Sequence, residues 1–284
     1  MKFFTLLLPT ALAFAAPLAA QDAKEKPATE RQTAAADATA DLAFGAFQKG
    51  LYLSAYAEAT RRIEERKDPK AMTLVGELLA NGLGVKLDEK RAAYWYELAA
   101  EAGDREAIYA LGILHLEGRV FPRDVAAAER WFRAGAEQDL ADAQHALAIL
   151  YREGDGIGKD PAKAAQWLER AVKLDHAPAM IELGIALFNG DGAPRDEARA
   201  ANLFRQAALR GNPVGQNRYA RVLSAGRGTA QNSVEACLWH SLARAQTISD
   251  PQLDRVCDTL APAGRESVAK RLENWLKGAA HDRS

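Results

Sequence analysis

The chain has 284 residues, a formal net charge of −1 and 48% hydrophobic residues, many of them alanine. A charge balance this close to zero argues against a nucleic-acid-binding protein and against a polybasic membrane-binding segment. The length suffices for about two globular domains, although one elongated array of repeats can also absorb all of it.

The first 20 residues have the pattern of a secretory signal peptide. Lys2 is followed by an apolar run over residues 3–16 and by small residues up to Ala20, which predicts export with cleavage after Ala20, into the periplasm. The alternative is an uncleaved anchor, but the run is shorter than the roughly 20 apolar residues of a membrane span. We expect no stable membrane insertion of the mature chain. Residues 21–40 are polar and lack an apolar period, which favours a disordered linker.

From residue 71 the sequence repeats with a constant step of 36 residues. A period between 20 and 50 residues is typical of stacked repeats. The small residue that opens each unit recurs as Ala71, Ala107, Ala143, Ala179 and Gly215. The glycine that ends the first half of each unit recurs as Gly82, Gly118, Gly154, Gly190 and Gly226. The aromatic position of the second half reads Trp95, Trp131, Trp167, Leu203 and Trp239.

One unit, residues 107–142, shows what each repeat must be. Apolar residues fall on one face of a first helix, which Gly118 can end because glycine tolerates the left-handed conformation. Asp124 can cap a second helix, and the equivalent residues are Asp88, Asp160, Asp196 and Asn232. The second helix places Ala128, Trp131, Phe132 and Gly135 on one face. A single hairpin cannot bury these faces, but stacked hairpins can. The sequence therefore predicts an all-α solenoid, a right-handed superhelix of antiparallel helix–loop–helix repeats.

This pattern resembles the Sel1-like repeats, relatives of the tetratricopeptide repeats, of an exported bacterial type. The first full copy carries the family's sequence features: Ala71, Val75-Gly76, Gly82-Leu83-Gly84-Val85, Asp88, Ala92, Trp95-Tyr96, Ala99-Ala100 and Gly103-Asp104. The resemblance covers residues 41–250. The departures are Val120 in place of the second loop glycine of copy two, Leu203 in place of tryptophan, and Tyr219-Ala220 in place of Leu-Gly.

The predicted array has six units and a C-terminal cap. A short first repeat spans 41–70, and five full copies span 71–106, 107–142, 143–178, 179–214 and 215–250. Residues 251–277 form capping helices, the last with Val268, Leu272, Trp275 and Leu276 inward and Arg265, Glu266, Lys270 and Arg271 outward, and 278–284 form a tail. Cys237 and Cys257 lie on consecutive helices near this end. In an exported protein they either form a disulfide or stay as two buried thiols.

Three patterns could carry chemistry, and each has a simpler explanation. The five histidines lack metal-ligand spacing, so we expect neither a metal nor a cofactor. Residues 154–159, GDGIGK, fall in an interhelix loop and lack the spacing of a phosphate-binding loop. Ser267 and Lys270 match the Ser-x-x-Lys pair of penicillin-reactive enzymes, and some cysteine-rich relatives are described as penicillin-binding. The remaining motifs of that chemistry are missing, so we expect no enzyme and no catalytic residue.

Some first-helix positions are not needed for packing inside a hairpin and line the concave groove in related repeats. They are Tyr109, Ile113, Leu116, His145, Ile149, Arg152, Ile181, Ile185 and Phe188, with Asn217 and Arg221 as part of a polar rim. Copies one and five are more polar at these positions. One interpretation is packing between neighbouring repeats, and the other is an apolar strip that receives a peptide or helix.

The resemblance implies a non-enzymatic scaffold that binds a protein or peptide partner in its groove. We expect a monomeric adaptor or regulator at the cell envelope, for example of a membrane sensor protein. The alternatives are a penicillin-binding or penicillin-hydrolysing enzyme, a host-directed secreted effector, or a purely structural spacer. The functional step rests on analogy with the family.

Overall fold

A computed structural model describes residues 42–281, so the predicted signal peptide, the predicted linker and residues 282–284 lie outside the described part. This part is helical, with no strand, and opens with a short helix over residues 42–48. The helices that follow are α2 (Tyr52–Arg66), α3 (Pro69–Asn81), α4 (Glu89–Glu101), α5 (Arg105–Glu117), α6 (Val125–Glu137), α7 (Ala141–Glu153), α8 (Pro161–Lys173), α9 (Ala177–Asn189), α10 (Glu197–Leu209), α11 (Pro213–Ala225), α12 (Ser233–Ala245), α13 (Pro251–Asp258) and α14 (Pro262–His281). Among these residues, no helix has both the length and the apolar character of a membrane span.

The predicted capping residues lie at the ends of the helices as expected. Gly118 follows α5 at φ +74° and donates its N–H to the Leu114 carbonyl oxygen. Asp124 accepts a 2.8 Å hydrogen bond from the Ala127 N–H at the start of α6. The other four predicted glycine caps and the other four Asp or Asn caps have the same roles. The 36-residue period therefore fixes both ends of the interhelix loop in all five copies.

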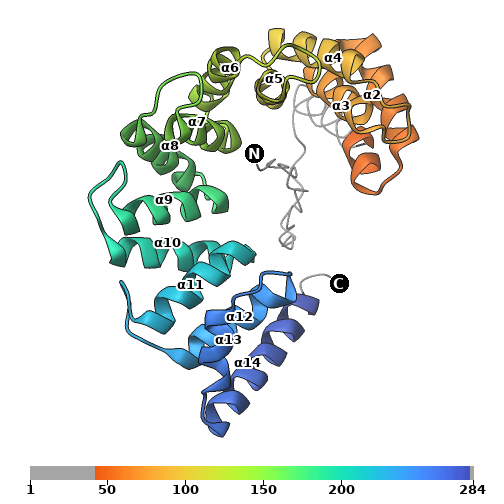
Figure 1. The fold of residues 1–284 in the computed structure, drawn as a ribbon. Helices are drawn as coiled ribbons and strands as arrows, with labels where there is room; N and C mark the ends of the chain where they lie inside the picture. The colour runs from red at the N-terminus through yellow and green to blue at the C-terminus, as the bar shows by residue number, and fades with distance from the viewer. Residues whose placement is uncertain (1–41, 282–284) are drawn as a thin grey trace, which may run out of the picture.

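The helical hairpins follow one another around an open arc (Figure 1). In that view α3, α5 and α7, the first helices of their hairpins, lie closer to the centre of the arc than α4, α6 and α8. Each first helix packs on its own second helix and each second helix on the next first helix. The predicted solenoid is confirmed, and α3, α5 and α7 lie on its inner side.

A close contact between a glycine and an aromatic ring holds the hairpins of copies one, two and four together. A Cβ atom built on Gly112 of α5 would lie 2.4 Å from Phe132 Cε1 of α6. Gly76 faces Tyr96 and Gly184 faces Phe204 in the same way, at 2.6 Å each. In these three copies the buried ring thus belongs to the residue that follows the tryptophan position. Trp95, Trp131 and Trp167 at that position are only half-buried, whereas Trp239 of copy five is buried.

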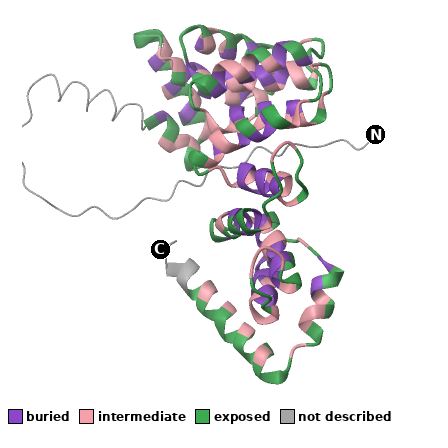
Figure 2. Ribbon diagram, turned by 90° about the vertical axis from the view of Figure 1, so that its left-hand side faces the viewer, coloured by how far each residue is buried: buried purple, intermediate pink, exposed green. Residues whose placement is uncertain are grey.

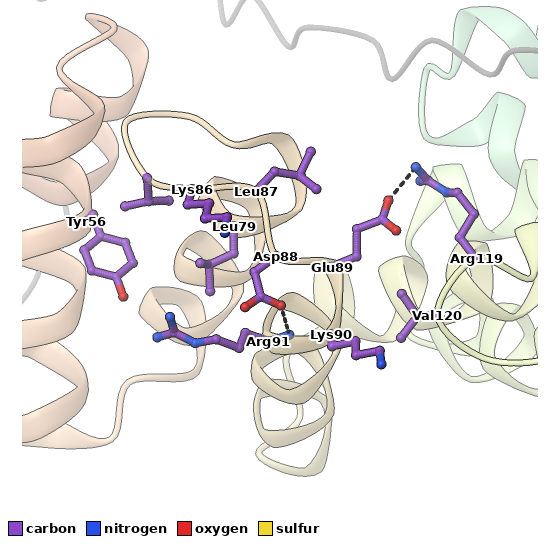
Figure 3. A pocket seen from close by; sticks show the side chains of 11 residues that line it. Tyr56, Leu79, Lys86, Leu87, Asp88, Glu89, Lys90, Arg91, Arg119 and Val120 are labelled. Atoms are coloured by element: carbon purple, nitrogen blue, oxygen red, sulfur yellow. Dashed lines mark hydrogen bonds and ion pairs between the residues drawn. The ribbon is translucent and has the colours of Figure 1, made fainter.

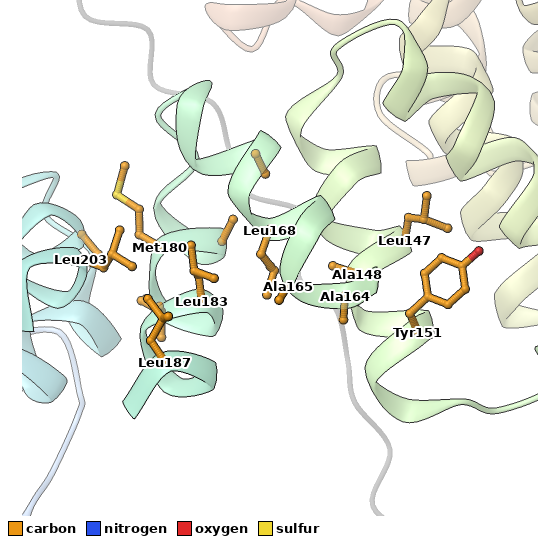
Figure 4. Packing of buried hydrophobic residues seen from close by; sticks show 14 of the residues in the cluster. Leu147, Ala148, Tyr151, Ala164, Ala165, Leu168, Met180, Leu183, Leu187 and Leu203 are labelled. Atoms are coloured by element: carbon orange, nitrogen blue, oxygen red, sulfur yellow. The ribbon is translucent and has the colours of Figure 1, made fainter. Parts of the chain in front are cut away.

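The core consists of three clusters rich in alanine and leucine, each of which spans more than one repeat. Buried residues lie between the helices throughout the arc (Figure 2). Figure 4 shows Leu147, Leu168, Leu183 and Leu203 in successive helices, each buried. Because no repeat closes its own core, each copy stabilises its neighbours.

The C-terminal helices cover the last repeat. Trp275 of α14 packs on Trp239 of α12, with ring centroids 5.4 Å apart, and α14 otherwise presents exposed and half-buried residues (Figure 2). The predicted outward residues of α14 are exposed, Val268 and Leu272 are half-buried, and the Leu276 side chain lies outside the described part. Cys237 of α12 and Cys257 of α13 form a disulfide, with their Cα atoms 5.5 Å apart.

Candidate binding surface

The candidate groove positions near the start of each first helix lie between repeats. Thr73 of α3 donates a 2.7 Å hydrogen bond to Asp104, which caps the next first helix, α5. At the equivalent position Ile181 is buried, and Asn217 is buried beside Asp250. Ile181 and Asn217 are therefore not part of an exposed surface, because both are buried and Asn217 is hydrogen-bonded to the residue that caps α13.

Tyr109 and His145 occupy the same position in α5 and α7. The Tyr109 ring packs on Phe132 at 5.6 Å, and burial raises the pKa of its phenol to about 12. The His145 ring lies 5.0 Å from the ring of His176, the residue that caps α9. For both residues, packing between neighbouring helices accounts for most of the contacts.

A small polar cluster surrounds His145. His176 Nδ1 accepts the Ala179 N–H at 3.2 Å, so its Nε2 carries the proton and donates to Asp142 Oδ1, also at 3.2 Å. Burial of the imidazole and the nearby His176 lower the pKa of His145 to about 4, although Asp142 opposes this. The hydrogen bond from His176 in turn lowers the pKa of Asp142. The cluster therefore keeps His145 neutral at physiological pH.

Asn217 and Arg221 of α11 bind the residue that caps α13. The Asp250 carboxylate accepts hydrogen bonds from Asn217 Nδ2 at 2.9 Å and Arg221 Nε at 2.6 Å. Burial of Asp250 acts to raise its pKa, but these two donors outweigh burial and hold the pKa at about 2. Arg221 and Asn217 thus fasten the C-terminal cap to the last repeat, a role that the sequence pattern did not reveal.

Three isoleucines remain half-buried at the same position of successive first helices. We call Ile113 of α5, Ile149 of α7 and Ile185 of α9 the inner strip. Ile113 and Ile185 pack partly on the core that spans copies two to four. Since α5 and α7 lie on the inner side of the arc (Figure 1) and all three residues are half-buried, the strip combines support from the core with partly exposed apolar surface.

Polar groups border the strip one turn further along each first helix. Arg152 pairs with Glu182 of the next first helix, and the Arg227 guanidinium lies 4.0 Å from the centre of the Phe188 ring. Arg227 also donates to Glu197, whose pKa the Arg227 and Arg195 side chains lower to about 2. Leu116 is half-buried against the core. The sequence predicted Arg152 and Phe188 but missed their partners, which lie 30 to 39 positions away.

The residues considered for chemistry remain scattered. Among the described residues, no group of three or more His, Cys, Asp or Glu side chains is placed to hold a metal ion. Ser267 and Lys270 are both exposed on α14. Residues 154–159 form the loop between α7 and α8, where Gly154 ends one helix and Asp160 caps the next. His115 stacks on Phe121, with ring centroids 4.6 Å apart.

Stacked helical hairpins with a half-exposed apolar strip on the inner helices define a helical-repeat scaffold. The family described as Sel1 repeat matches residues 69–104, 105–140, 141–176, 177–212 and 213–247. The chain therefore belongs to the Sel1 repeat family. Each matched range starts two residues before the corresponding full copy of the sequence analysis. No protein with a curated description matches the chain significantly.

Two crystal structures are similar to this fold. A Sel1 repeat protein from Oxalobacter formigenes is 27% identical, with a TM-score of 0.64 over 72% of this chain and 83% of that one. The protein c5321, a protective antigen present in uropathogenic Escherichia coli strains, is 24% identical, with a TM-score of 0.67 over 85% of this chain and 56% of that one. The second likeness concerns the fold alone.

Proposed function

We propose that this chain is an exported, non-enzymatic scaffold that holds a protein or peptide partner along the inner strip. The Sel1 repeat fold suits protein interaction. The observation that carries the proposal is the placement of Ile113, Ile149 and Ile185, one per repeat, each half-buried at the same position of successive first helices. A solenoid that needed only internal packing would not require large apolar side chains at this partly exposed position, and copies one and five have Glu77 and Arg221 there.

The shape of the strip fits an elongated apolar partner. An amphipathic helix or an extended peptide can place one apolar side chain over each repeat. The ion pair between Arg152 and Glu182 lies beside the strip and supplies polar groups for the rim of such an interface. Leu116 and Phe188 extend the apolar surface, and Arg227 shields the Phe188 ring.

The proposed location is the cell envelope, reached through the N-terminal signal. Lys2 and the apolar run over residues 3–16 support export, and so does the disulfide between Cys237 and Cys257. An adaptor or regulator of an envelope protein is the role that fits both features. N-terminal sequencing of the exported chain should begin at Gln21. A mature chain that retains residues 1–20 contradicts this part of the proposal.

The test of the inner strip is a crosslinking pull-down from the exported fraction. We expect the variant Ile113→Asp/Ile149→Asp/Ile185→Asp to lose a partner that the wild type captures, because three buried charges would face the apolar side of that partner. The matched control carries Tyr94→Asp, Leu174→Asp and Leu209→Asp, three exposed apolar residues away from the strip. This control should keep the partner.

Circular dichroism separates the remaining outcomes. If the inner-strip variant stays helical and keeps every partner, the strip is not the binding surface. If it unfolds while the control variant stays folded, the three isoleucines are core residues and the proposal is again contradicted. A partner that both variants lose would bind through another part of the scaffold.

A further inference from the structure

One interhelix loop differs from the others at a position where the repeats touch. Gly84, Gly156, Gly192 and Gly228 each have a φ between +68° and +80° and press on the start of the preceding second helix. A Cβ atom at Gly192 would lie 2.1 Å from the Pro161 carbonyl oxygen, and one at Gly228 would lie 1.9 Å from that of Glu197. The equivalent residue in the remaining copy is Val120.

Val120 cannot make this approach, because its Cβ would collide with the start of α4. Beside Val120 lies a pocket of about 480 Å³, lined by residues of α2, of the loop before α4, of the start of α4 and of the loop after α5. We call this the junction pocket. Figure 3 shows Glu89 and Lys90 on one side of it and Arg119 and Val120 on the other, with the Glu89–Arg119 ion pair of 2.7 Å spanning the gap.

The junction pocket has an apolar floor and a positive wall. Leu79 is buried at its base, and Val85 and Val120 pack partly on the same core. The wall holds three cations that we call the unpaired cations: Lys86, Lys90 and Arg91. Within residues 42–281, no carboxylate lies within ion-pairing distance of any of them. Figure 3 shows Arg91 extending toward Tyr56 and Lys90 extending toward Val120.

The other repeats show that the fold does not require the two lysines. The position of Lys90 is occupied by Ala126, Ala162, Ala198 and Val234, and that of Lys86 by Pro122, Gly158, Pro194 and Ala230. Leu87, which is 57% exposed at the mouth of the pocket, corresponds to Arg123, Lys159, Arg195 and Gln231. Four departures from the repeat, counting Val120, thus meet at one cavity. Lys86, Lys90 and Leu87 do not improve packing, because two add solvated charges and one exposes a leucine.

We propose that the junction pocket binds a short acidic peptide segment that carries an apolar residue. The apolar side chain would pack on Leu79, Val85 and Val120, and carboxylates on either side of it would pair with the unpaired cations. The three unpaired cations and Arg119 outnumber the carboxylates of Asp88 and Glu89, so the lining carries a net positive charge. The Asp88 carboxylate also already accepts a hydrogen bond as the cap of α4. An anion without an apolar part would leave the floor uncovered, so the geometry favours a peptide over inorganic phosphate.

The test is fluorescence anisotropy with three labelled peptides. The first alternates glutamate and leucine. The second, of glutamate and serine, tests the need for an apolar side chain, and the third, of lysine and leucine, tests the need for negative charge. We expect the wild-type full chain to bind the glutamate–leucine peptide most tightly and to lose affinity as salt rises. Lys90→Ala should weaken binding by roughly two- to fivefold, the usual range for an exposed ion pair. Val120→Gly, which restores the loop residue of the other copies, should weaken it by about tenfold or more because it removes apolar contact and lets the loop close.

Two controls make the result decisive. Lys173→Ala removes an exposed lysine of α8 and should bind like the wild type. The inner-strip variant should also bind the peptide normally, so failure of this proposal is distinct from failure of the proposed function. Val120→Gly and Lys90→Ala use residues that other copies contain, and unchanged circular dichroism would verify their folding. The proposal is overturned if folded Val120→Gly binds the glutamate–leucine peptide as tightly as the wild type does. It is also overturned if the wild type binds phosphate or the lysine–leucine peptide as tightly as the glutamate–leucine peptide.

Discussion

The contact between Gly112 and Phe132 offers the sharpest test of how one repeat holds together. In Gly112→Ala two effects compete. Alanine is favoured over glycine inside a helix by about 1 kcal/mol. However, the new Cβ would lie 2.4 Å from Phe132 Cε1, and overpacking of this kind costs about 1–3 kcal/mol. We expect net destabilisation of about 1 kcal/mol, although the substitution improves helix propensity.

Copy three supplies the compensating partner. There the equivalent residues are Ala148 and Leu168, both buried, so a methyl group on the first helix accompanies a smaller side chain on the second. Phe132→Leu alone should cost about 1–2 kcal/mol through the space it leaves. In the double variant the new methyl group fills part of that space. The double-mutant cycle should therefore give a favourable coupling free energy of about 1–2 kcal/mol.

Urea unfolding followed by circular dichroism measures each term of the cycle. The slopes of the transitions must be compared first, because an array of repeats need not unfold as one unit. Additive costs of Gly112→Ala and Phe132→Leu would refute the reasoning. Stabilisation by Gly112→Ala alone would do the same, since it would show that the ring moves aside at no cost.

Three further predictions concern pH and the C-terminal cap. As pH falls from about 6.5 to about 4, His145 takes up a proton in the unfolded chain but stays neutral in the folded chain. The free energy of unfolding should therefore drop by at most about 3 kcal/mol. Thermal melts of His145→Leu should lack this part of the drop. The Asp250 carboxyl, with a pKa near 2 against an ordinary 3.8, contributes about 2 kcal/mol above pH 3.8 that disappears as pH falls through 2. Asp250→Asn should therefore destabilise the chain at pH 7 and not at pH 2, and an equal loss at both would contradict the ion pair with Arg221. Reduction of the disulfide, or Cys237→Ser/Cys257→Ser, should lower stability by about 3 kcal/mol, and an unchanged melting temperature would show that α13 is held without it.

The repeat period predicted most of the fold, because the residues that recur with it determine where helices begin and end. The left-handed conformation at Gly118 and the capping oxygen of Asp124 are properties of single residues, and each recurs in every copy. The period could not decide which ring fills a hairpin. Trp131 and Phe132 are adjacent and both apolar, and only the short distance from Gly112 shows that Phe132 is the buried one.

The candidate surface was harder to predict for a related reason. The residues at positions 109, 145, 181 and 217 recur on one helical face, but their exposure depends on how closely the next repeat packs. Asp104 reaches Thr73 and Asp250 reaches Asn217, so these sites became contacts between repeats. Interaction partners some 30 residues apart follow from the superhelix and not from the pattern of one helix.

A repeat protein contains its own control for separating stability from function. Where all five copies share a residue type, as at the glycine that ends each first helix, the fold accounts for it. Where one copy has a different residue, either that residue improves packing or another cause must explain it. Leu203 departs from tryptophan and is buried, so packing explains it. Val120, Lys86, Leu87 and Lys90 depart together, leave a cavity and expose charge and apolar surface. Since no gain in packing accounts for Lys86, Leu87 and Lys90, the proposed ligand of the junction pocket supplies a physical reason for them.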